Sequence, residues 1–568
     1  MFYMSEKPLN IAFVWNQHQP YYKDTVKNEY IMPWVRLHGC KNYYQMVAIL
    51  RDYPTIRATF NLTPALIDQI EDYLKGEAVD YYLLVMKPAR NLNHREKGFL
   101  LQHYFDIHWD RIIALYPRYQ QLLNKQGRKR EPAALERVVD KFSTQDYLDL
   151  QVWFNLVWID LEIREKDPFL KELQEKGSNF TEEEKSTLLA KQWNILRKIM
   201  PEHKELQEKG QIEIITTPYY HPILPLLIDS NSALRVNPGM PLPQQFQYPE
   251  DALAQTKKSI EQYKSYFGLK PYGVWPPEQA VSPEAIMQLV ELGFSWTISD
   301  EEILAKSLGI DIYRDEFGHV TNPEVLYQPY RVNINGSEIA MIFRDHFLSD
   351  KIGFTYHHMS VHHAVDDMHH RLHKIRENLR GSTGNYLVTI SLDGENAWEW
   401  YPNDRKDFLH LLYRRLSDDP LLNTVTVNSY LEANPPSQKL NYIFTGSWVH
   451  HNLARWIGTR NKNVMWDYLR KTREDFQKKV DAGESPEKIK KARESLFMAE
   501  GSDFPWWVDS TSYYLAAPFE ALFRKHLMNV YKVLEMEIPE YLKEPVLEAP
   551  VEGREWKYDP LAGPTAMA

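Results

Sequence analysis

Short apolar runs rich in β-branched and aromatic residues recur along the chain, and longer stretches with helical periodicity separate them. Such an alternation is typical of parallel strands joined by helical crossovers. Eight segments fit the strand pattern: residues 10–15, 57–62, 212–217, 272–275, 295–299, 340–343, 387–392 and 424–427. The pattern therefore predicts an α/β fold with a barrel of parallel strands at its centre.

Polar and charged residues follow several of these runs and head the next loop. They are Asn16-Gln17-His18, Tyr219-Tyr220-His221, Glu278, Arg344-Asp345 and Asp393-Gly394-Glu395. In barrels of parallel strands the active site lies at the carboxyl ends of the strands. We therefore expect these side chains to converge at one mouth of the barrel.

Two long helical stretches lie outside this alternation. Residues 77–209 are too many for one crossover and carry mostly helical patterns, which predicts a helical insertion on the barrel. After the break Asn434-Pro435-Pro436-Ser437 the pattern becomes helical again. We expect a catalytic barrel over residues 1–435, with its insertion at about 77–209, and a C-terminal α-helical domain over residues 436–568 that contributes to the substrate cleft.

The composition narrows the class of ligand. Aromatic residues make up 13% of the 568 residues, and flat aromatic faces suit sugars and other flat or apolar ligands. The net charge of -10 argues against a nucleic-acid partner or an anionic membrane surface. The chain has a single cysteine, Cys40, no apolar run of 18 residues and no signal-peptide pattern. We expect a cytoplasmic protein without a membrane partner, and the oligomeric state stays open.

Two carboxylic acids stand out by their surroundings. Glu278 follows Pro276-Pro277, which restrict the backbone, and Asp393 precedes Gly394, where the chain can turn sharply. A lone carboxyl at a strand end is more often a helix cap or an ion-pair partner than a catalyst. Tryptophans lie close to both residues in the sequence, however, which favours a function in ligand binding or catalysis. Two carboxyl groups about 5–5.5 Å apart suit a retaining glycosidase, whereas a wider spacing admits an inverting water.

Several motifs occur in a characteristic order. NQHQP (16–20), GQIEI (210–214), GVWPPEQA (273–280), LDGEN (392–396) and GSWVHHNLARWIG (446–458) resemble the ordered signature regions of glycoside hydrolase family 57. FRDHFLSDKIGF (343–354) and AEGSDFPWW (499–507) narrow the resemblance to its amylopullulanase and α-amylase-like branch. The matches span residues 16 to 507, and their order and spacing together are highly specific.

The resemblance implies an incomplete (β/α)7 barrel followed by a helical domain, and a retaining mechanism on α-glucans. It implies Glu278 as the nucleophile and Asp393 as the acid/base, the pair that the strand-end pattern also selects. A seven-strand barrel leaves one strand-like segment over, and we expect it to be 295–299 or 424–427. This chemistry requires no cofactor, and the expected partner is an α-glucan or a maltooligosaccharide.

Further residues are expected to hold the substrate. His18 and Gln19 lie in the first motif, and His18 fits a ligand for sugar hydroxyls, with a structural histidine as the alternative. For His221, a role in binding substrate and a role in packing are about equally favoured. Asp345 is expected to bind sugar hydroxyls. The residues expected to support the site are Glu213, Arg344 and Glu395.

Tryptophans are candidates for stacking on glucosyl rings, because the axial C–H faces of a sugar pack on an aromatic plane. The candidates are Trp275, Trp398 and Trp448, and the alternative for each is core packing. For Trp448 the C-terminal domain would have to reach over the barrel mouth. His450 and His451 follow Trp448, where the resemblance leads us to expect a smaller or polar loop. The resemblance therefore does not define the subsites that would bind the acceptor sugar.

A dense run of histidines, TYHHMSVHHAVDDMHHRLH (355–373), raises the question of a metal. On a helix, His358, His362 and Asp366 would share one face with ligand-like spacing. A solvated amphipathic helix is the favoured interpretation, because no HExxH motif accompanies the run. We therefore expect no metal site.

Three functions remain open at this point. The first is a hydrolase of α-1,4 and possible α-1,6 links in starch-like glucans, and the second is a 4-α-glucanotransferase or branching enzyme with the same fold. The third is a carbohydrate-binding protein without turnover, which the presence of both Glu278 and Asp393 argues against. The motifs GVWPPEQA and FRDHFLSDKIGF favour the hydrolase through the family resemblance alone.

Overall fold

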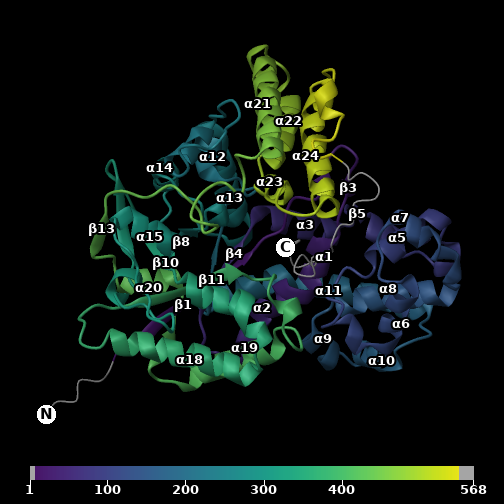
Figure 1. Ribbon diagram of the computed structural model, residues 1–568, viewed down its shortest axis with the longest axis horizontal. Coiled ribbons are helices and arrows are strands. Elements are labelled where there is room, and N and C mark those ends of the chain that lie inside the picture. Colours follow the sequence, from purple (N-terminus) through teal and green to yellow (C-terminus); the bar gives the residue numbers. More distant parts are fainter. Residues whose placement is uncertain (1–6, 549–568) are drawn as a thin grey trace.

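A ring of parallel strands forms the centre of the computed structural model, which describes residues 7–548 (Figure 1). Within these residues the ring has seven strands, in the spatial order β11, β1, β4, β6, β7, β8, β10. Their bounds are β1 (Leu9–Gln17), β4 (Ala58–Leu62), β6 (Ile212–Ile215), β7 (Gly273–Val274), β8 (Trp296–Asp300), β10 (Ser337–Arg344) and β11 (Leu387–Asp393). The first four and the last three belong to separate sheets, which a bridge between Thr216 and Val274 joins.

The ring stays open between β10 and β11. No ladder forms between these two strands in the described part of the chain, where the Asp345 N–H donates a hydrogen bond of 2.9 Å to the Thr389 carbonyl at the gap. The ring is therefore an incomplete (β/α)7 barrel, and the fold class predicted from the sequence is confirmed.

The eighth strand-like segment is 424–427. Thr424 ends β12 (Leu422–Thr424), which pairs with the first residues of β1 as a side branch, and Val427 already begins α20 (Val427–Ala433). Residues 295–299 instead contribute to β8 in the ring. The second sheet is extended by β9 (Tyr330–Ile334) and β13 (Gln438–Leu440), so the chain still adds to this sheet after residue 435.

Helices cover the ring on its outside and form two further groups. Those between ring strands are α1 (Trp34–His38), α2 (Tyr44–Ala48), α3 (Pro64–Lys75), α12 (Leu224–Ile228), α13 (Pro249–Phe267), α14 (Pro283–Glu291), α15 (Glu301–Leu308), α16 (Pro323–Leu326), α17 (His346–Asp350) and α18 (Val361–Asn378), and α19 (Lys406–Asp418) follows β11. A small sheet consists of β2 (Lys23–Asp24), β3 (Glu29–Tyr30) and β5 (Val79–Asp80). Its last strand, β5, directly precedes the first of the two further helical groups in the sequence.

The stretch between β5 and β6 folds as a helical lobe beside the barrel, at the right of Figure 1. It contains α4 (Tyr81–Leu84), α5 (His94–His103), α6 (Pro117–Gln126), α7 (Pro132–Glu136), α8 (Thr144–Val157), α9 (Leu161–Lys166), α10 (Pro168–Lys176) and α11 (Glu182–Glu208). Reciprocal capping boxes fix where α5, α8 and α11 begin, because each satisfies two backbone donors of the first turn. The pairs are Asn93 with Glu96, Ser143 with Asp146 and Thr181 with Glu184.

The C-terminal helices stand together over one end of the barrel (Figure 1). They are α21 (Arg460–Asp481), α22 (Pro486–Ala499), α23 (Asp503–Trp507) and α24 (Tyr513–Val533). The start of α23 is tied to the barrel, because the Ser502 N–H donates to the His221 carbonyl at 3.0 Å. Residues 549–568 of the predicted C-terminal domain lie outside the described residues. Between residues 7 and 548, no helix has both the length and the apolar character needed to cross a membrane.

A small apolar cluster fills the interior of the barrel. On β1, Ala12 and Val14 belong to this cluster while Phe13 packs into the main core outside, as the alternation of side chains along a strand requires. Trp275 and Trp296 add the largest side chains to the interior. The barrel is therefore a packed core, and a ligand can bind only at its ends.

Glu213 is a buried carboxyl in this interior. It accepts hydrogen bonds from the Trp296 indole N–H at 2.9 Å and from the Asn428 N–H at 2.8 Å. Burial raises its pKa to about 7. These partners make Glu213 a link between strands of the barrel, at a distance from the cavity described next.

Candidate active site

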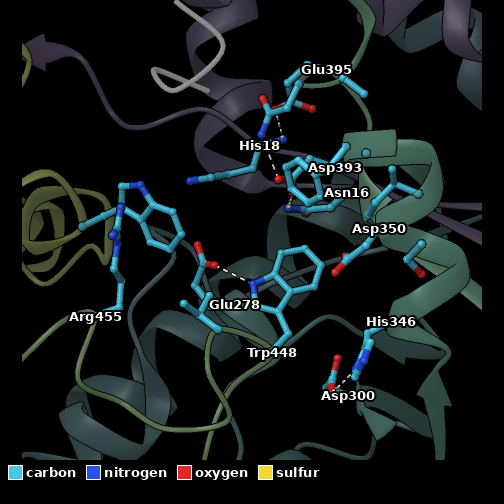
Figure 2. A pocket seen from close by; sticks show the side chains of 18 of the residues that line it. Asn16, His18, Glu278, Asp300, His346, Asp350, Asp393, Glu395, Trp448 and Arg455 are labelled. Carbon is cyan, nitrogen blue, oxygen red and sulfur yellow. Dashed lines mark hydrogen bonds and ion pairs between the residues drawn. The ribbon is translucent and has the colours of Figure 1, made fainter. Parts of the chain in front are cut away.

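A cavity of about 840 Å³ lies at the carboxyl ends of the strands, a volume within the range of ligand pockets. The barrel contributes Asn16, His18, Glu278, Asp393 and Glu395 to its lining, the loop 446–458 contributes Trp448 and Arg455, and the segment around α23 contributes Asp503, Trp506 and Trp507. Figure 2 shows the Glu278 and Asp393 side chains reaching into the same space from different elements. Three segments that are distant in the sequence thus enclose one site.

Glu278 sits on a short turn, η7 (Pro277–Gln279), in an unusual backbone conformation. Its φ is 56° and that of Gln279 is 50°, both in the left-handed region that residues other than glycine rarely adopt. The Trp448 N–H donates to the Glu278 carbonyl at 3.1 Å, so the loop that carries Trp448 holds the turn in place. Such strain is concentrated at functional sites, because only a fixed surrounding maintains it.

The Glu278 carboxyl has one close hydrogen-bond donor, the Trp448 indole N–H, which lies 2.8 Å from Oε2 (Figure 2). Burial and the charge of Asp393 raise the pKa of Glu278 to about 8, against the opposing effects of Trp448 and the Arg455 cation. The Arg455 guanidinium itself lies 4.1 Å from the centre of the Trp506 ring. Glu278 therefore carries a proton readily in the resting protein, with a donor and a cation at hand when it ionises.

Asp393 ends β11 and lies opposite Asn16, the residue paired with it on β1. The Asn16 amide donates to Oδ1 at 3.0 Å and the Asn396 amide donates to Oδ2 at 2.8 Å. Burial raises the pKa of Asp393, while these amides and the positive potential of His18 and Arg344 oppose the rise. The charge of Asp393 in turn raises the pKa of Glu278.

His18 lies on the cavity wall within a network of hydrogen bonds. Its Nε2 lies 2.8 Å from Asp503 Oδ1, and its backbone N–H donates to Glu395 Oε1 at 3.2 Å. The Tyr43 hydroxyl donates to the same Glu395 oxygen at 3.1 Å. Glu395 thus supports the segment that carries His18, and Asp503 fixes the orientation of the His18 ring.

His221 packs behind His18, with the two rings stacked at 3.8 Å. It is 1% exposed, and its Nδ1 lies 2.8 Å from Ser502 Oγ. Burial lowers its pKa far below the usual value, which keeps the ring neutral. The expected contact of His221 with substrate is therefore corrected: this side chain contacts His18, and it does not line the cavity.

Two of the proposed stacking surfaces also need correction. Trp275 is fully buried in the barrel interior and meets Trp448 edge-on, with ring centres 5.2 Å apart. Trp398 is fully buried in the main core, where its indole N–H donates to the Gly394 carbonyl at 2.7 Å. Neither ring offers a face to a sugar, because both are fully buried. Trp448 does line the cavity.

Two polar residues expected to bind substrate are buried as well. Gln19 is inaccessible to solvent and accepts a hydrogen bond of 2.9 Å from the Tyr22 hydroxyl. Asp345 caps α17 through the Leu348 N–H at 2.9 Å and forms an ion pair of 3.0 Å with Arg314. Both expectations are corrected, because these side chains are committed to partners inside the fold.

Arg344 lines the cavity beneath Trp448. Its Nε donates to Asp300 Oδ2 at 2.9 Å, and its guanidinium lies 4.8 Å from the centre of the Trp448 ring. Arg344 therefore contacts the Trp448 ring whose N–H donates to Glu278, and its supporting role stays a prediction. Asp300 also lies 3.4–3.5 Å from one nitrogen each of His346 and His451.

Asn16 is among the strand-end side chains expected at the mouth, whereas Arg455, Asp503 and Trp506 were not predicted as individual residues. Arg455 lies in the motif GSWVHHNLARWIG, and Asp503 and Trp506 lie in AEGSDFPWW. The missing information was three-dimensional: the sequence does not say which side chains of the C-terminal helices and the preceding loop turn toward the barrel mouth. The pairing of a carboxylate with two tryptophans in Asp503 to Trp507 was the available signal.

Two groups of possible metal ligands border the cavity. In the first, His18 Nε2 is hydrogen-bonded to Asp503 and His221 Nδ1 to Ser502, while the buried His221 Nε2 has no hydrogen-bond partner among the described residues. In the second, Asp300 pairs with the Arg344 cation beside His346 and His451, which disfavours a further cation.

Paired carboxyls in an aromatic cavity at the mouth of a barrel are typical of glycosidases. The sequence model of the family described as Glycosyl hydrolase family 57 matches residues 12–442, so the chain belongs to this family. An alpha-amylase of Pyrococcus horikoshii is 23% identical over 331 residues, which are 56% of this chain and 44% of that protein. The chain spans less than half the length of the curated relatives that it matches.

Solved structures share the fold at low sequence identity. A branching enzyme from Thermococcus kodakaraensis superposes with a TM-score of 0.58 and 16% identity, covering 92% of this chain and 90% of that one. An alpha-amylase from Thermotoga maritima gives a TM-score of 0.54 and 13% identity, with coverage of 94% and 95%. These similarities extend the fold assignment over nearly the whole chain.

Proposed function

We propose that the protein is a retaining glycosidase that cleaves α-1,4-glucosidic bonds in starch-like glucans and maltooligosaccharides. The observation that carries the proposal is the pair of partly buried carboxyls, Glu278 and Asp393, facing one cavity with raised pKa values and aromatic surfaces around them. Membership of the family and the resemblance to its α-amylase-like branch support the same reaction.

In the first step, protonated Asp393 donates its proton to the glycosidic oxygen while ionised Glu278 attacks the anomeric carbon. The glycosidic bond breaks, the leaving sugar departs with the proton, and a glycosyl–Glu278 ester forms. The Trp448 indole N–H and the Arg455 cation stabilise the ionised form of Glu278. Protonation of Asp393 removes the negative charge that raises the pKa of Glu278.

In the second step, the Asp393 carboxylate takes a proton from a water molecule, and the oxygen of this water attacks the anomeric carbon. The ester bond breaks, Glu278 is released as a carboxylate, and Asp393 is protonated again. His18 and Asp503 line the same cavity as Asp393, where they suit hydrogen bonds to sugar hydroxyls. The Trp448, Trp506 and Trp507 side chains suit contacts with the sugar faces.

Transfer to a sugar hydroxyl is the second candidate. A sugar hydroxyl in place of water would make the protein a 4-α-glucanotransferase or a branching enzyme, and structural similarity to a branching enzyme supports this alternative. Cleavage of α-1,6 links, the amylopullulanase activity, is part of the same question. No cofactor is needed for either reaction, and a cytoplasmic setting would suit the single buried thiol of Cys40.

The deciding experiment is a chromatographic product profile from maltoheptaose, soluble starch and pullulan, each incubated separately, with Glu278→Gln as the blank. Shorter sugars with a matching rise in reducing ends support hydrolysis, and products from pullulan extend it to α-1,6 links. Longer and shorter sugars without new reducing ends would replace hydrolysis by transfer. No product from any substrate would contradict the proposed function.

A further inference from the structure

The histidine run of residues 355–373 folds differently from the expectation. Helix α18 begins at Val361 after the cap Ser360, so His358 lies in the preceding turn and does not share the helix face of His362 and Asp366. The shared helix face considered for these three residues is therefore not formed. A second pair on the same helix, His369 and His373, lies four residues apart and faces another element.

Both of these rings converge on one carboxylate oxygen. His369 Nε2 lies 2.8 Å and His373 Nε2 lies 2.6 Å from Asp419 Oδ2, which belongs to the turn between α19 and β12. The two ring centres are 4.6 Å apart. The three potential ligand atoms all lie within 4.8 Å of one another. Two histidines at this helical spacing together with a carboxylate are a known zinc-binding arrangement.

The surroundings of Asp419 prepare it as a monodentate ligand. Its other oxygen, Oδ1, accepts a hydrogen bond of 2.9 Å from the Leu421 N–H, which fixes the direction in which Oδ2 points. The ion pairs of Asp419 with described residues are those with His369 and His373. The Asp300 group in the cavity differs, because there the Arg344 guanidinium already neutralises the carboxylate.

We propose that His369, His373 and Asp419 bind one divalent transition-metal ion, with Zn²⁺ as the natural candidate. Bonds of about 2.0–2.2 Å to two imidazole nitrogens and one carboxylate oxygen would place the ligand atoms about 3.3–3.6 Å apart at tetrahedral angles. The nitrogen–oxygen distances of 2.8 and 2.6 Å must therefore widen by about 0.5–1 Å. The side chains can move this far because they are 22%, 31% and 13% exposed, which also gives the ion access. Water fills the fourth position.

The proposed site lies at the end of the barrel opposite the cavity. Asp419 stands just before β12, which pairs with the first residues of β1, whereas Asn16 and Asp393 are at the carboxyl ends of β1 and β11. The ion would link α18 to the turn after α19, both at the lower part of Figure 1. We therefore expect it to stabilise the fold without changing turnover.

The test is a calorimetric titration of the full chain with ZnCl₂ at pH 7.5, together with thermal unfolding in the presence and absence of Zn²⁺. We expect one zinc equivalent that is lost, or weakened at least about tenfold, in His373→Ala and Asp419→Asn. The control His370→Ala changes a neighbouring histidine on the same helix that is outside the group, and it should bind zinc as the wild type does. Zinc should raise the Tm of wild type and control only.

A second measurement uses the unsubstituted protein. Co²⁺ in place of Zn²⁺ should give the intense visible absorption of a four-coordinate site, and Zn²⁺ should displace it. Equal zinc binding in wild type, His373→Ala and Asp419→Asn would overturn the proposal. The absence of any zinc binding or cobalt absorption in the wild-type protein would overturn it as well, even if the variants failed to fold.

Discussion

The two walls of the cavity hold their carboxyls in different ways. On the barrel wall, Asp393 ends a regular strand and accepts one amide hydrogen bond on each oxygen, from Asn16 and Asn396. On the wall where the loop 446–458 covers the barrel, here called the loop wall, Glu278 stands on a left-handed turn and accepts a single indole hydrogen bond from Trp448 of that loop. A regular strand thus positions Asp393, whereas contacts from a loop distant in the sequence position Glu278.

This difference bears on protonation. Two amide donors favour the ionised form of Asp393 and partly offset the rise in its pKa that burial causes, whereas burial and the charge of Asp393 raise the pKa of Glu278 to about 8. The proposed first step needs a proton on Asp393 and a charge on Glu278. The following variants test the two carboxyls separately.

The largest effect is expected on the loop wall. Glu278→Gln should reduce kcat on maltoheptaose by about 10⁴-fold or more, because an amide cannot form the glycosyl ester. The matched control Glu284→Gln alters a half-exposed glutamate six residues further on, which pairs with Arg235 at the surface. Steady-state kinetics should show wild-type turnover for the control. Comparable turnover in both variants would remove Glu278 from the mechanism.

On the barrel wall, Asp393→Asn should lower kcat by about 10²–10⁴-fold, the usual contribution of a general acid. A maltosyl fluoride substrate, whose leaving group needs no proton, should recover the first step in this variant and leave Glu278→Gln inactive. Release of fluoride measures that step directly. If fluoride release recovered in Glu278→Gln instead, the roles of the two carboxyls would be exchanged.

The link between the loop and Glu278 can be weakened by Trp448→Phe, which keeps an aromatic ring and removes the indole donor. A hydrogen bond to a charged group contributes about 1.5–3 kcal/mol, so kcat should fall by about 10–100-fold. Trp506→Phe is the control for a change of ring size in the same cavity. An unchanged kcat for Trp448→Phe would mean that this donor does not stabilise the ionised Glu278.

The smallest expected effect concerns stability. A carboxyl whose pKa rises from its usual value of 4.5 to about 8 on folding binds its proton more tightly in the folded state. Folding stability is therefore lost as the pH rises from about 4.5 to about 8, and Glu278→Gln avoids this loss. The Tm of the variant should exceed that of the wild type by at least about 2 °C at pH 8, with a smaller gap at pH 5. A gap that is constant over this pH range would contradict the raised pKa.

The sequence was sufficient for the regular part of the molecule. Apolar runs with polar ends indicated the strands and led to Glu278 and Asp393, which the structure brings to one cavity while their catalytic roles stay predictions. Apolar pattern could not separate residues 424–427 from a ring strand, because a side branch buries its residues equally well.

The aromatic and polar side chains around the pair were harder to assign. Trp275 and Trp398 stand close to the carboxyls in the sequence but pack into the two cores, since neighbouring residues at a strand end can point to opposite sides. Arg455 and Asp503 reach the cavity only through the packing of the loop and the C-terminal helices, which local patterns do not encode.

The hydrogen bond between His18 and Asp503 joins residues 485 positions apart in the chain. During synthesis on a ribosome, the barrel strands that carry both carboxyls emerge long before α23 does. A nascent or truncated chain without that helix would have both carboxyls but an open wall, so the site becomes complete only after α23 has been made. Activity would thus report that synthesis has passed this helix.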